Sequence, residues 1–183
     1  MFQSTTLPGG RRHALRLGAT DYAEPGAYFI TIRTADRAPI LGDVTAGLLA
    51  PSDAGRIVRR EWLRTGFLRW DVRLDAFVAM PDHVHAIVLL DDVREDGAPR
   101  RTRLGALIGG FKAACAVAIN ELRDTPGASV WQRGYFERML RDEDEVREVR
   151  RHIYENPSRW QRAALDRRLD SRNESGAATR PPR

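Results

Sequence analysis

The sequence is poor in cysteine and in long apolar runs, and each shortage excludes a class of protein. Cys115 is the only cysteine, so a scaffold held by intramolecular disulfides is excluded. No uninterrupted apolar run approaches the roughly 18 residues that a membrane span requires. The N-terminal residues also lack the hydrophobic core of a secretory signal. We therefore expect a soluble, cytoplasmic protein.

Lysine is almost absent, although the chain is basic. Lys112 is the single lysine among 30 basic residues, and the formal net charge is +5. The planar guanidinium group of arginine matches phosphate oxygens, so a surplus of arginine is typical of phosphate and nucleic-acid recognition. A genome rich in G and C, which encodes arginine in place of lysine, explains the same ratio without any function.

What is present is the composition of one globular domain with a basic segment at each end. Hydrophobic residues make up 42% of the 183 positions, enough for one sizeable core. Residues 1–24 carry arginines and the breaker Pro8-Gly9-Gly10, which predicts a loosely attached basic arm. We expect the folded domain over 25–162 and a disordered tail, rich in Arg and Pro, over 163–183.

Hydrophobic periodicity predicts both strands and helices. Strand-like patterns predict strands at 28–34, 70–80 and 83–90. They also predict a short hairpin at 40–49 and a strand or extended segment at 130–137. Helical spacing predicts helices at 52–66, 104–122 and 142–155, the last ending before Pro157. An exposed connector is expected over 91–103. This order favours an α/β (α+β) fold, with an antiparallel sheet and helices packed on it.

The triplet His83-Val84-His85 is the most informative motif. Residues two apart on a strand point to the same face, so the two imidazoles are expected side by side, where they can bind one divalent cation. The plain structural interpretation is that both are half-buried strand side chains. A two-histidine site needs a further donor, for which the candidates are Asn156, Glu155, Asp82 and His152.

Four segments together point to a known family. They are Pro25–Thr31, Met80–His85, Val130–Glu137 and Ile153–Pro157. In order and spacing they resemble the signatures of REP-associated tyrosine transposases, which are relatives of the insertion-sequence-200-like single-tyrosine transposases. The resemblance covers about residues 12 to 162. It implies a ferredoxin-like or RRM-like domain with helices packed on one face of the sheet and the His-hydrophobic-His (HUH) motif on a central strand.

The same resemblance implies an activity and its residues. Members cleave and rejoin single-stranded hairpin DNA through a covalent 5′-phosphotyrosine, with Mg²⁺ or Mn²⁺ as cofactor. His83, His85 and Asn156 match the metal ligands. The nucleophile position, four residues before Asn156, falls on His152, where the family has tyrosine. Tyr154 points away from that side of a regular helix, unless the helix distorts before Pro157.

Four interpretations of the nucleophile stay open at this point: Tyr154 after local rearrangement, no nucleophile at all, His152 as a phosphohistidine, or Tyr135 or Tyr22. Three functions are therefore weighed. The first is a metal-dependent transposase, acting as a monomer or homodimer. The second is a domesticated relative that binds hairpin DNA without cleaving it. The third is an α/β protein without either activity.

Basic and aromatic side chains are expected to contact the DNA. Lys112 follows Phe111, which matches a Phe-Lys pair frequent in the family, and it is weighted most. The remaining candidates are Arg103, Arg133, Tyr135 and Arg150. Each has an ordinary alternative as a solvated or core side chain. Arg138 is a second departure from the family, because relatives commonly carry histidine there.

Overall fold

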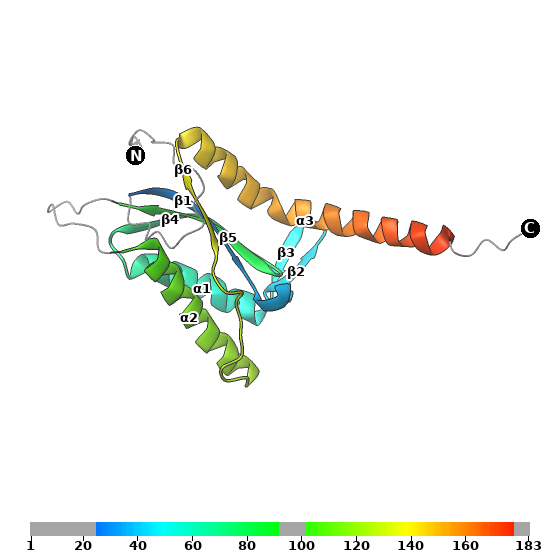
Figure 1. Cartoon of the computed structure of the whole chain (residues 1–183), viewed down its shortest axis with the longest axis horizontal. Coiled ribbons are helices and arrows are strands. Elements are labelled where there is room, and N and C mark those ends of the chain that lie inside the picture. The colour runs from blue at the N-terminus through cyan, green and yellow to red at the C-terminus, as the bar shows by residue number, and fades with distance from the viewer. Residues whose placement is uncertain (1–24, 92–101, 178–183) are drawn as a thin grey trace, which may run out of the picture.

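The computed structural model describes residues 25–91 and 102–177, with side chains as far as Arg162 (Figure 1). The expected arm over 1–24 and nearly all of the expected connector over 91–103 lie outside the described residues. The strands are β1 (Gly26–Arg33), β2 (Gly42–Thr45), β3 (Leu48–Pro51), β4 (Val72–Met80), β5 (His83–Leu90) and β6 (Phe136–Leu140). The helices are the short 3-10 turn η1 (Ala35–Arg37), α1 (Asp53–Phe67), α2 (Leu104–Arg123) and α3 (Glu143–Ala177).

The main sheet has the strand order β4-β5-β1-β6, and every neighbouring pair is antiparallel. β5, which carries the His-Val-His triplet, is therefore an interior strand, as expected from the resemblance. Its register against β1 places Arg33 opposite His83 and Thr31 opposite His85. The mixed fold with an antiparallel sheet is confirmed.

Helices cover both faces of this sheet. On one face α1 and α2 bury side chains such as Ile30 and Val84 in the larger core. On the other face α3 packs over Ile87 with its own Val149 and Ile153. The expectation of helices on one face holds for α1 and α2 but is wrong for α3. The physical reason is that β5 is apolar at nearly every position, so both of its faces need cover.

Local sequence signals explain where several elements begin. Ser52 caps α1, because its hydroxyl oxygen accepts a hydrogen bond from Gly55 N at 3.1 Å. The β2–β3 hairpin turns through Ala46 and Gly47, whose φ angles are 52° and 73°. Two positive φ angles in a two-residue turn match the twist of the flanking strands.

The end of α3 differs from the prediction. The helix runs through Pro157 as far as Ala177, so the predicted end at Glu155 is wrong. Residues 163–177 of this helix belong to the segment for which we expected a disordered tail. Proline removes a helical hydrogen bond, and Figure 1 shows α3 bending about midway along its length. Beyond the proline, Trp160 packs into the smaller core beside Val44 and Leu49 of the hairpin. This tertiary contact supports the helix past its own breaker.

The last strand begins later than predicted. β6 starts at Phe136, and only a single bridge joins Trp131 to Thr34 in the preceding segment. Trp131 is buried and donates its indole N–H to the Lys112 carbonyl at 3.1 Å. Residues 130–135 are thus held both by α2 and by backbone hydrogen bonds at the end of β1, where Gln132 N donates to the Arg33 carbonyl at 2.9 Å.

Helix α2 is long and apolar enough to cross a membrane by length and composition alone, with a mean hydropathy of 1.3. The helix contains no uninterrupted apolar run of that length, so the sequence criterion used above did not identify it. In the fold, the Leu107, Ile108 and Phe111 side chains of α2 are buried in the core against the sheet and α1. A core helix accounts for that hydropathy.

Candidate metal and nucleic-acid site

The histidine pair, His83 and His85, lies on the face of β5 that α3 covers. The two ring centroids are 4.5 Å apart. His83 is 8% exposed and His85 is half-buried. The side-by-side arrangement predicted from the spacing is confirmed, and the pair sits in a mostly desolvated position.

Each imidazole of the pair is held through its Nδ1 atom. Nδ1 of His83 donates to the Asp82 carboxylate at 2.5 Å, and that carboxylate also accepts from Arg37 Nε at 2.9 Å. Nδ1 of His85 lies 2.8 Å from the Thr31 hydroxyl oxygen. Such contacts fix ring orientation and leave Nε2 for another partner, which is the usual second layer around a metal-binding histidine.

Burial keeps both imidazoles neutral. It lowers the pKa of His83 despite the neighbouring Asp82 carboxylate, and it lowers the pKa of His85 to about 3, with a further contribution from His83. The positive charge of Arg33 lowers both pKa values further. The neutral form is the one that binds a metal ion.

Helix α3 presents a stripe of side chains to the histidine pair. The stripe is His152, Asn156 and Trp160, spaced four residues apart on one side of the helix. The His152 ring lies 5.7 Å from the His85 ring, and the Trp160 ring lies 5.8 Å from the His83 ring. Asn156 is 8% exposed and lies on the helix between these two contacts. Asn156 therefore lies on the side of α3 that faces the pair.

This donor set fits a divalent cation. His83 and His85 would supply two imidazole nitrogens and Asn156 an amide oxygen, and solvent or a phosphate oxygen would complete the shell. Within the described residues, no group of three or more His, Cys, Asp or Glu side chains is placed to hold a metal ion. His152 is thus a neighbour of the pair and not a third imidazole ligand as it stands.

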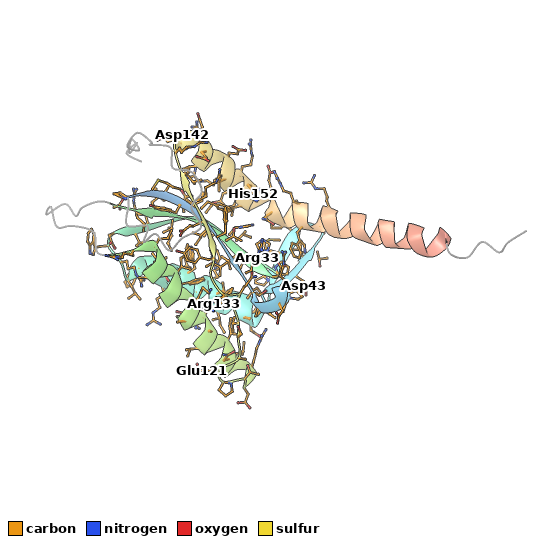
Figure 2. The ribbon with its side chains drawn as sticks, in the orientation of Figure 1. Arg33, Asp43, Glu121, Arg133, Asp142 and His152 are labelled. Carbon is orange, nitrogen blue, oxygen red and sulfur yellow. The ribbon has the colours of Figure 1, made fainter. Side chains whose placement is uncertain are left out.

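The structure separates the two candidate nucleophiles on α3. His152 is half-buried and its ring is also 6.5 Å from the Phe29 ring; Figure 2 shows it on the part of α3 that lies over the sheet. Tyr154 is 65% exposed on the opposite side of the helix. Because α3 continues through Pro157, the helix does not end in a way that would bring Tyr154 to the pair.

The predicted DNA-binding residues do not gather at one place. Tyr135 packs against the larger core, on the face of the sheet opposite the histidine pair. The Lys112 ammonium donates to the carbonyls of Gln132 and Gly134, both at 2.8 Å, which ties α2 to the segment that follows it. Arg103 and Arg133 are exposed, and Figure 2 shows Arg133 well away from His152.

Two arginines fasten α3 to the sheet. Arg150 donates to Asp75 of β4 through Nε at 2.8 Å and Nη2 at 2.5 Å. Arg138 of β6 donates to Glu145 at 2.6 Å. β4 and β6 are the two edge strands of the sheet, so these ion pairs hold α3 from both sides. Arg150, predicted to contact DNA, has this structural partner instead in the described structure.

Sequence reasoning missed the residues that surround the pair from neighbouring strands. Arg33 is exposed directly opposite His83 in the register, and Thr31 contacts His85. Phe136 is 55% exposed at the start of β6 and lies opposite Thr31. The signal that would have found them is strand register, which a single sequence does not specify.

Comparison with known proteins supports the fold. No protein-family model matches the chain. A Haemophilus influenzae protein described only as uncharacterised is 28% identical over 168 residues, which cover 84% of this chain and 92% of that protein. The solved structure of a REP-associated tyrosine transposase bound to a REP hairpin matches with a TM-score of 0.58 at 18% identity, over 79% of this chain and 74% of that chain.

A crystallised candidate transposase from Deinococcus radiodurans also matches, with a TM-score of 0.43 and 19% identity over 76% of this chain and 95% of that one. At 18% identity, the likeness to the REP-associated tyrosine transposase structure shows a shared fold and not a shared activity. The chain therefore has the fold of the REP-associated tyrosine transposase, which agrees with the resemblance first seen in its motifs.

Proposed function

We propose that this chain is a transposase-type protein of the REP-associated tyrosine transposase family that binds single-stranded hairpin DNA and acts on one of its phosphodiesters. The observation that carries the proposal is that the α3 stripe and the histidine pair meet on one face of the sheet, with the His152 ring 5.7 Å from the His85 ring. The hairpin-bound structural relative adds support.

The residues of the pair and the stripe would divide the work. His83, His85 and Asn156 would hold Mg²⁺ or Mn²⁺, which when bound polarises the scissile phosphate. Arg33, exposed beside His83, would contact a phosphate oxygen. Asp82 and Thr31 keep the two imidazoles in orientation. Positive charge and neutral imidazoles thus surround the place where a DNA strand would lie.

The side chain that faces this place is His152, so the proposed nucleophile is its imidazole and not Tyr154. A ring nitrogen of His152 forms a bond to phosphorus, and the bond between phosphorus and the 3′-oxygen breaks. The ring loses one proton to solvent, and the leaving oxygen gains one to give a free 3′-hydroxyl. The 5′-phosphate stays on the protein as a phosphohistidine, which the 3′-hydroxyl reverses on rejoining.

A second candidate function rests on a specific observation. Tyr154, with 65% of its surface exposed, is on the wrong side of α3 to reach the pair, and the family position of the tyrosine holds histidine. A protein that binds hairpin DNA and never cleaves it has these properties too. The two functions differ in whether a covalent adduct forms.

The test is covalent trapping. The full chain is incubated with a labelled library of single-stranded hairpins and Mn²⁺, and adducts are resolved on a denaturing gel. Parallel reactions use His152→Ala, Tyr154→Phe and the double variant His83→Ala/His85→Ala. Retained adducts are then exposed to acid, because a phosphorus–nitrogen bond is acid-labile and a phosphotyrosine ester is acid-stable.

The results separate the functions. An acid-labile adduct lost in His152→Ala and kept in Tyr154→Phe supports the proposal. An acid-stable adduct lost only in Tyr154→Phe assigns the chemistry to a displaced tyrosine. Hairpin binding with no adduct identifies the non-cleaving relative. Absence of salt-dependent hairpin binding contradicts both.

A further inference from the structure

An exposed aromatic side chain lies at the edge of the candidate site. Phe136, the first residue of β6, is 55% exposed, although a large apolar side chain at a strand position would normally be buried. β6 is an edge strand, so no further strand of the described residues covers it. Its ring is therefore accessible from solvent at the edge of the candidate site.

Strand register puts Phe136 in one row with the histidine pair. Phe136 lies opposite Thr31 on β1, and Thr31 lies opposite His85 on β5. Residues directly opposite one another share a face of the sheet, so all three side chains are on the α3 face. The Phe136 ring stands edge-on to the Phe29 ring at 6.3 Å, and Phe29 is 5.2 Å from His85.

The neighbouring row supplies a phosphate contact. Arg33 is opposite His83, and β6 begins at Phe136, so no β6 residue lies opposite Arg33. Beside the largely buried histidine pair, the surface thus carries the exposed Arg33 side chain and the exposed Phe136 ring. Basic groups that follow a backbone, next to an aromatic ring, are what single-stranded nucleic acid requires.

We propose that Phe136 is a stacking platform for one unpaired nucleobase of the DNA strand whose phosphate lies at the histidine pair. This inference rests on the proposed DNA-binding function and specifies the ligand that occupies the β6 edge. The base stacks on the phenyl ring without hydrogen bonding, so the platform tolerates any base. Arg33 contacts the phosphate on the histidine side of that nucleotide.

The chain offers a matched control. Phe67 is also an exposed phenylalanine, at 90%, but it ends α1 on the opposite face of the sheet. Replacing either residue by alanine removes the same phenyl group. Only the Phe136 change should affect a base near the histidine pair.

The experiment measures the affinity of the full chain for a fluorescent DNA hairpin with an oligothymidine flank on each side. An abasic position is moved along each flank in turn. We expect Phe136→Ala to weaken binding about tenfold, within the range for one stacked base. Phe67→Ala and Phe136→Trp should leave the affinity unchanged. One abasic position should weaken the wild type equally and cause no further loss in Phe136→Ala.

The outcomes are distinct. Equal affinities of Phe136→Ala and Phe67→Ala, with binding by the wild type, overturn the platform and leave the proposed function intact. A change in oligomeric state caused by Phe136→Ala, with DNA affinity unchanged, assigns the residue to a contact between two copies and also overturns the platform. A wild type that binds no hairpin overturns both proposals. If Phe136→Ala weakens binding as expected but no covalent adduct forms, the stacking platform is supported and the function of the chain is restricted to DNA binding.

Discussion

The imidazole of His152 lies 5.7 Å from that of His85, although the two residues come from different elements on opposite sides of a helix–sheet contact. Val149 and Ile153 are buried on the side of α3 that packs against the sheet, and this packing sets the distance between the two rings. The ring of His152 is neutral, because burial lowers its pKa and Arg159 lowers it further. An imidazole thus occupies the helix position at which the family that the sequence resembles has the phenol of tyrosine.

Restoring tyrosine at this position should change the product. We expect His152→Tyr to form an acid-stable covalent adduct with hairpin DNA in Mn²⁺, because the phenol would start from the helix position that faces the histidine pair. Tyr154→Phe should not affect that adduct. The measurement is the denaturing-gel assay with acid treatment. No adduct from a His152→Tyr protein that still binds the hairpin would contradict the geometry assigned to α3.

Removing the histidine pair should abolish cation binding. His83→Ala/His85→Ala is expected to lower Mn²⁺ affinity by at least 100-fold, because Asn156 and solvent alone make a weak site. Hairpin affinity should fall less, since phosphate contacts dominate it. Titration calorimetry measures both. His13→Ala is the matched control, because it removes a histidine that lies outside the candidate site in the sequence, and this variant should bind Mn²⁺ like the wild type.

The Asp75–Arg150 ion pair should make stability depend on acid. The hydrogen bond from Arg150 lowers the pKa of Asp75 below its ordinary value of 3.8. A carboxylate with a depressed pKa stabilises the fold above its unfolded pKa, and this stabilisation is lost as pH falls through the folded pKa. Asp75→Asn should cost about 1 kcal/mol at neutral pH, because the pair is partly exposed.

The difference between wild type and Asp75→Asn should therefore shrink as pH falls below about 4. Urea unfolding at several pH values measures it. Asp144→Asn is the control, because Asp144 is exposed and, among the described residues, its ion pair is with Arg147 of the same helix. A constant difference at every pH would show that Asp75 does not act through its charge.

Lys112 should contribute to stability more than to DNA affinity. Its ammonium donates to two backbone carbonyls, and Lys112→Met would leave those carbonyls without that donor. The expected loss is about 1 kcal/mol of unfolding free energy, because both hydrogen bonds are exposed and water can take the place of the ammonium. Arg133→Met removes an exposed charge nearby and should cost much less. A Lys112→Met protein of normal stability and weak hairpin binding would favour the DNA contact predicted from the sequence.

Much of the fold was predictable because it depends on local patterns. The alternation in Val72–Met80 and the helical spacing in Leu104–Arg123 identify their elements, and Ser52 caps α1 as its position predicts. The side-by-side placement of His83 and His85 follows from the period of a strand alone. The boundaries that were predicted wrongly are the start of β6 and the end of α3, and both depend on contacts with distant residues.

The sequence by itself determined the side-by-side histidine pair and the strand that carries it, because both depend on residue identity and spacing within one element. The family resemblance of its motifs implied the central place of that strand and the departure from tyrosine at His152. Only the tertiary structure decided that α3 covers the face of the sheet opposite α1 and α2. It alone placed Asn156 toward the pair, used Lys112 and Arg150 as structural ties and brought Arg33 and Phe136 beside the imidazoles. Those relationships depend on strand register and on the way a helix packs across a sheet, and both are set by burial of apolar side chains far apart in the chain.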